Sequence, residues 1–107
     1  NIIKERTISI IYLEGLYQFS PSRMDALLED EIKMINKADI KHTILLAHEN
    51  VANGQRAISN TKTINLDPNE ETTINLKEMF GATGTVFLSF KYEKLPSRNG
   101  FISIIEE

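Results

Sequence analysis

The stretch Val51-Ala52-Asn53-Gly54-Gln55 decides the predicted fold. Asn-Gly between two apolar-rich runs is typical of a type I′ β-turn, because both central residues of that turn take positive φ angles. The stretch therefore predicts a β-hairpin near the middle of the chain, and with it an antiparallel, β-rich domain. The tip of such a hairpin is also a candidate binding loop, made of Val51, Ala52, Asn53, Gly54 and Gln55.

The runs on both sides of this turn alternate in polarity as β-strands do. Residues 41–49 place four side chains on one face of the predicted strand: His42, Ile44, Leu46 and His48. Because successive side chains of a strand point to opposite faces, such a row marks a half-buried strand. Similar patterns predict further strands over residues 55–66, 72–76, 85–92 and 101–105.

Residues 21–37 carry a helical pattern. Pro21 suits the first turn of a helix, and Asp25 complements the helix dipole there. The apolar positions follow the i, i+3, i+4 spacing of one helix face: Met24, Leu27, Leu28, Ile32 and Ile35. We therefore expect an amphipathic helix that follows a first strand within residues 6–17.

These elements together predict an α+β domain that is predominantly antiparallel β. One helix follows the first strand, and a five-strand meander follows the helix, since short connections favour antiparallel neighbours. The alternative is a β-sandwich with a helical insertion. At 107 residues the chain is a single domain, 1–107, and it begins with Asn rather than Met, so we expect it to be excised or processed from a larger chain.

Composition excludes several classes of function. Twelve basic and 15 acidic residues give a net charge of -3, which argues against a nucleic-acid-binding surface. No apolar run reaches the roughly 18–20 residues that a membrane-spanning helix needs. The absence of cysteine excludes disulfides, thiolate metal sites and cysteine nucleophiles. The compartment is unknown, with an extracellular, cell-surface or virion location favoured over the cytoplasm.

Two histidines offer no obvious metal site. His48-Glu49 begins like a zinc-protease motif, but Ala52 stands where the second histidine should be. His42 and His48 share a strand face, yet six residues of strand hold them about 20 Å apart. We expect structural histidines, no cofactor, no catalytic residue, and a chain that is not an enzyme.

The loop that contains Asp67, Asn69 and Glu71 has the alternating oxygen side chains of a calcium loop. However, Thr72 stands where the sharp turn of such a loop needs glycine. A polar hairpin loop is therefore the preferred interpretation, and calcium binding is the alternative.

A strand, then a helix, then hairpin-linked antiparallel strands resembles the cystatin fold, in which a sheet wraps one long helix. Cystatins carry a Q-x-V-x-G loop in the first hairpin after the helix. The matching residues here are 49–53, with Glu49 for Gln, Asn53 for Gly, and Val51 retained. The resemblance implies a domain that binds or inhibits cysteine proteases.

The preferred functional hypothesis is a non-catalytic protein-interaction or assembly module of a larger bacterial surface, secreted or phage-structural protein. Such a protein would have a protein partner or associate with itself. The alternatives are a cystatin-like protease-binding or inhibitor domain, and a small enzyme or subunit whose site is dispersed along the sequence.

Overall fold

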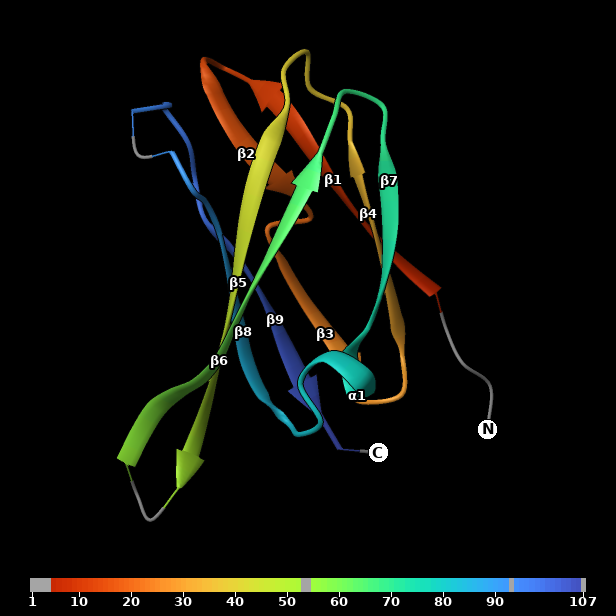
Figure 1. Ribbon diagram of the computed structural model, residues 1–107, viewed down its shortest axis with the longest axis vertical. Helices are drawn as coiled ribbons and strands as arrows, with labels where there is room; N and C mark the ends of the chain where they lie inside the picture. The colour runs from red at the N-terminus through yellow and green to blue at the C-terminus, as the bar shows by residue number, and fades with distance from the viewer. Residues whose placement is uncertain (1–4, 53–54, 93, 107) are drawn as a thin grey trace.

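The computed structural model describes residues 5–52, 55–92 and 94–106 and shows two β-sheets packed face to face (Figure 1). The elements follow one another as β1 (Glu5–Leu13), β2 (Leu16–Ser20), β3 (Arg23–Leu27), β4 (Glu31–Asn36), β5 (His42–Ala52), β6 (Gln55–Leu66), β7 (Glu71–Asn75), α1 (Leu76–Met79), β8 (Gly84–Phe90) and β9 (Gly100–Ile105). One sheet has the order β2-β1-β4-β7, and the other has the order β3-β9-β8-β5-β6.

The predicted α+β fold is wrong, because residues 21–37 form β3, a turn and β4 instead of a helix. In β4, Ile32, Met34 and Asn36 are buried while Lys33 and Ile35 between them are only partly so, which is the period of a strand. Helix propensities differ by only a few tenths of a kcal/mol per residue, about 0–0.7 for most residues. Pairing of β4 with β1 and β7, and of β3 with β9, outweighs that preference.

The predicted five-strand meander is also wrong. β1 pairs with β4 in parallel, and β3 pairs with β9 in parallel, so not every neighbour is antiparallel. The chain passes from one sheet to the other between β2 and β3 and back again between β3 and β4. The connection from β1 to its parallel neighbour β4 thus runs through β2 of the same sheet and β3 of the opposite sheet, without a crossover helix. Neither a cystatin-like wrapped helix nor a helical insertion exists in the described parts of the chain, where the one-turn α1 is the only α-helix.

The hairpin prediction is confirmed for the strands that flank it. β5 and β6 pair antiparallel along their whole lengths, from His42 opposite Leu66 to Ala52 opposite Gln55. This hairpin extends past the end of the sandwich at the lower left of Figure 1. The predicted turn residues, Asn53 and Gly54, lie outside the described residues.

The core lies between the two sheets and consists of one face of most strands. On β5, the predicted inward face is confirmed, since His42, Ile44, Leu46 and His48 are all buried. β8 contributes Val86, Leu88 and Phe90, while the first sheet and β9 contribute mainly isoleucine: Ile8, Ile10, Ile32, Ile74, Ile102 and Ile104. Burial of this apolar surface at about 25 cal/mol per Å² drives the packing of the sheets.

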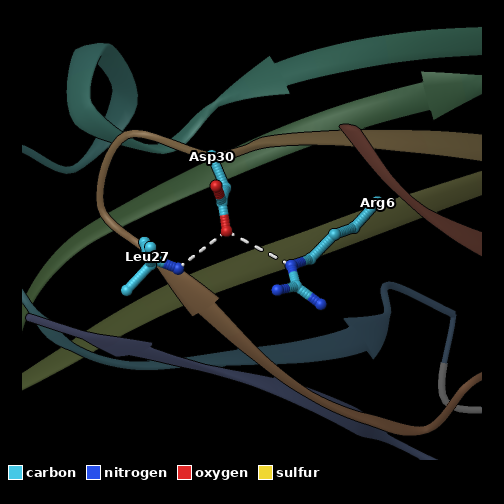
Figure 2. Close-up of polar contacts among 3 residues, drawn as sticks. All are labelled: Arg6, Leu27 and Asp30. Carbon is cyan, nitrogen blue, oxygen red and sulfur yellow. Dashed lines mark hydrogen bonds and ion pairs between the residues drawn. The ribbon is translucent and has the colours of Figure 1, made fainter. Parts of the chain in front are cut away.

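A buried carboxylate fastens the connection between β3 and β4 (Figure 2). Asp30 is 1% exposed, and its Oδ2 accepts the backbone N–H of Leu27 at 2.9 Å and the Arg6 Nε–H at 3.2 Å. The backbone N–H of Asp30 in turn donates to the Leu27 carbonyl at 3.0 Å. Leu27 ends a strand of one sheet and Arg6 lies in the other, so this carboxylate links the two sheets.

We predict that Asp30→Ala lowers the free energy of unfolding by about 2–4 kcal/mol, because it leaves a strand-end N–H and a guanidinium without their acceptor. Urea denaturation measures the change. Glu71→Ala is the matched control: its partly exposed ion pair with Lys33, 3.3 Å long, contributes at most about 1 kcal/mol. Equal losses in the two variants would contradict a special role for Asp30.

Candidate functional site

A hollow on the described surface lies at the end of the sandwich where β5 begins and β8 ends. β5 and β8 are antiparallel, with Ile44 opposite Phe90, so the residues before β5 and after β8 meet at one end of the sheet. Both segments lie at the top of Figure 1. The groove has a volume of about 600 Å³ and is lined by Ile40, Lys41, Lys91, Tyr92, Lys94 and Leu95.

Backbone hydrogen bonds hold the loop that forms one wall of the groove. The N–H of Lys91 donates to the carbonyl of Thr43 at 2.9 Å, which extends the β5–β8 pairing beyond Phe90. At the other end of the loop, Tyr17 of β2 donates its N–H to the Pro96 carbonyl and accepts the Arg98 N–H, both at 2.9 Å. The two ends of this loop are therefore tied to both sheets.

The lining combines apolar surface with positive charge. Ile40, Tyr92 and Leu95 supply aliphatic and aromatic contact, and Tyr92 is 57% exposed. Lys41, Lys91 and Lys94 are exposed and supply three ammonium groups, in a chain whose net charge is -3. Such a groove can take an apolar group and a negative charge at the same time.

Aromatic rings fill the interior next to the groove. His42 packs between Tyr17 and Phe90, with ring centroids 4.6 Å and 4.9 Å away, and Phe90 stacks on Phe19 at 4.6 Å. Tyr12 continues the series toward the surface, 4.7 Å from Tyr17. The first residue of β5 is thus enclosed by rings from both sheets.

His42 is 1% exposed, and its Nε2 is the one buried side-chain nitrogen or oxygen in the described residues that lacks a hydrogen-bond partner. Burial lowers the pKa of His42, and the nearby Asp39 carboxylate offsets part of that effect. Asp39 also accepts the Tyr17 hydroxyl at 3.3 Å. Desolvation, and then this carboxylate, raise the pKa of Tyr17.

The candidate sites from the sequence lie elsewhere. Val51 and Ala52 end β5 and Gln55 begins β6, at the far end of β5 from the groove, and Asn53 and Gly54 fall outside the described residues. His48 lies inside the sandwich, where its Nε2 is 3.1 Å from the Thr83 carbonyl oxygen.

The predicted calcium loop connects β6 to β7. Asp67 accepts the Glu70 N–H at its carbonyl, and the Glu71 carboxylate lies 3.3 Å from Lys33 Nζ. Among the residues that the structure describes, no three His, Cys, Asp or Glu side chains gather as a metal site would require. Calcium binding by Asp67, Asn69 and Glu71 stays a prediction.

The groove itself was not predicted from the sequence. Lys41 and Lys91 are far apart along the chain, and nothing in either segment alone indicates that they meet. The alternating pattern of 85–92 predicts a strand, but it does not say which strand pairs with it.

Comparison with known proteins identifies the fold. No family model matches the chain, and no curated protein matches it. Among solved structures, a purple cupredoxin from Nitrosopumilus maritimus has a TM-score of 0.61 at 14% identity, over 94% of this chain and 99% of that one. Auracyanin from Roseiflexus castenholzii has a TM-score of 0.62 at 12% identity, over 94% and 96%. A copper-containing nitrite reductase from Thermus scotoductus has a TM-score of 0.58 at 12% identity, over 97% of this chain but 23% of the enzyme. The chain has a cupredoxin-like β-sandwich fold.

These similarities overturn the predicted function. The chain resembles cupredoxins and domains of copper enzymes, and not an assembly module or a cystatin-like inhibitor. The prediction that the chain is not an enzyme stays a prediction. No helix within residues 5–52, 55–92 and 94–106 is long and apolar enough to cross a membrane.

The side chains of this chain do not fit a blue-copper centre. Such a centre takes two imidazoles and one cysteine thiolate, with a weak axial thioether. The sequence contains no cysteine and only two histidines. His42 and His48 lie about 20 Å apart along β5, so they cannot share one metal ion. No copper-based electron transfer follows from these residues.

We predict that the protein loses stability as the pH falls from about 6.5, the ordinary pKa of histidine, because folded His42 has a lower pKa and the unfolded chain takes up the proton first. The loss is complete below the folded-state pKa. Urea denaturation at pH 7.5 and 5.5 measures it. In His42→Phe, which keeps a ring in the cluster, the loss between these two pH values should shrink.

NMR titration of the His42 ring checks the same pKa without any substitution. An ordinary pKa for His42, or the same pH dependence in the His42→Phe variant, would show that burial of this ring does not couple stability to pH.

Proposed function

We propose that this chain is a cupredoxin-fold protein that binds a small organic molecule non-covalently, rather than a carrier of blue copper. The observation that carries the proposal is the groove between the start of β5 and the loop after β8, with its apolar side chains Ile40, Tyr92 and Leu95. Its volume of about 600 Å³ lies within the range of small-molecule sites, roughly 300–1,000 Å³.

Two further features support binding at this place. The wall of the groove is held by backbone hydrogen bonds to β5 and β2, so a ligand would not have to order a free loop. The aromatic rings of Tyr17, His42 and Phe90 fill the neighbouring interior. A preformed site keeps more of the contact energy as affinity.

The protein partner expected from the sequence would meet the molecule at this same end. Tyr12 and Leu13, at the end of β1, are 55% and 53% exposed, and the Tyr12 ring packs on Tyr17, which holds the groove loop. Exposed aromatic and aliphatic side chains are enriched in surfaces that bind other proteins. A partner would thus compete with, or cover, a bound ligand.

We predict that phenylnaphthylamine, an uncharged dye whose fluorescence rises in apolar surroundings, binds the protein at one site. Ile40→Asp should weaken binding about tenfold, which corresponds to about 1.4 kcal/mol of lost apolar contact. Fluorescence titration measures the affinity. Ile105→Asp is the matched control, because Ile105 is similarly exposed at the end of β9 but does not line the groove.

The control variant should bind the dye as the unmodified protein does. If the dye does not bind, or if both aspartate variants weaken it equally, the groove is not a ligand site. Circular dichroism of each variant verifies that the sandwich is folded.

A further inference from the structure

The rim of the groove carries positive charge from both of its sides. Lys41 precedes β5 on one side, and Lys91 and Lys94 stand on the loop after β8 on the other. Within the described residues, none of these three ammonium groups forms an ion pair, whereas Lys33 and Lys77 pair with Glu71 and Glu29. The carboxylate of Asp39, close by in sequence, accepts the Tyr17 hydroxyl.

We infer that the ligand is an amphipathic anion: an aryl or alkyl group that carries one carboxylate, sulfonate or phosphate. This inference rests on the proposed function and specifies the class of molecule bound. The apolar part contacts Ile40, Tyr92 and Leu95, while the anionic group lies among Lys41, Lys91 and Lys94. The two halves of such a molecule match the two kinds of side chain in the groove.

Charge complementarity selects the sign of the ligand's charge. Each exposed ammonium group attracts an anion only weakly, because salt screens the attraction. Several such groups around one hollow are therefore needed for a preference for anionic ligands. A second, smaller hollow of about 340 Å³ shows the contrast, because Lys62 and Glu78 both line it and their charges oppose each other. Among the described residues that line the groove near β5, the charged side chains are all lysines.

Size and net charge favour a small molecule over a nucleic acid. The groove holds one drug-sized molecule, whereas a nucleic-acid strand needs an extended basic track with stacking platforms. The chain as a whole carries a net charge of -3, so the surface outside the groove would repel a polyanion. A compact monoanion gains the local attraction without that repulsion.

Paired dyes test the inference on the intact chain. Anilinonaphthalene sulfonate and phenylnaphthylamine share their aromatic rings, and only the first carries a sulfonate. We expect the sulfonate dye to bind about tenfold more tightly at low salt, and the difference to shrink as salt screens the lysines. The double variant Lys41→Glu, Lys91→Glu should weaken the sulfonate dye about tenfold or more and change the affinity for the uncharged dye less than about twofold.

Lys77→Glu is the matched control, since Lys77 is an exposed lysine on α1 and does not line the groove. It should leave the affinities for both dyes unchanged. Octanoate should displace the sulfonate dye, and inorganic sulfate should not, because sulfate lacks the apolar part.

Each outcome of these experiments supports or overturns a named part of the inference. Equal affinity for the two dyes, with no effect of the lysine substitutions, overturns the anionic class and leaves the proposed ligand site standing. Binding of neither dye overturns both. A third outcome is that the protein binds neither free dye but sediments with anionic lipid vesicles, and that the lysine variant does not. That outcome overturns the small-molecule inference in favour of a membrane surface. Displacement by sulfate as effective as by octanoate overturns the amphipathic requirement.

Discussion

The antiparallel pairing of β5 with β8 is the constraint on which the rest of the molecule depends. β5 lies between β6 and β8, and its inward side chains are buried in the core. A slip of one residue would turn every side chain of β5 to the opposite face, so burial of Ile44 and Leu46 fixes the register with β8. The same register sets Lys41 and Lys91 beside one groove. Core packing therefore builds the candidate site.

Local patterns were sufficient to predict the strands β5, β6 and β8 and the inward face of β5. Alternation identified the inward row of β5 and the strand that became β8, and the β5–β6 pairing around the Asn-Gly signal is as predicted. Such features depend on residues close in sequence, which a single chain displays directly. The sequence did not show that the backbone of Gly84 lies against the Glu49 carbonyl, where a Cβ would clash. This contact depends on the pairing of two strands that are distant in sequence.

Residues 21–37 show where the same reasoning fails. Their spacing fits a helix face, and Ile32 and Met34 fit equally well the inner face of a strand. The neighbouring strands decide between helix and strand. β4 pairs in parallel with β1, and β3 pairs in parallel with β9, so the partners come from opposite ends of the chain. The groove escaped prediction for the same reason. Its walls, at Ile40 and Leu95, are adjacent only because two distant strands pair.

The fold and the side chains point to different chemistry. A sandwich shared with copper proteins supplies a framework, but function depends on the groups placed on it. Here the sequence lacks the thiolate that blue copper requires, and aromatic rings from both sheets surround His42 at the end of β5. These rings pack closely around the imidazole, whose Nε2 is buried without a hydrogen-bond partner in the described residues. Beside that interior, Tyr17 holds the groove loop through two backbone hydrogen bonds. The buried His42 thus packs on the ring of the same residue whose backbone holds the groove loop, so the aromatic interior and the candidate site meet at Tyr17.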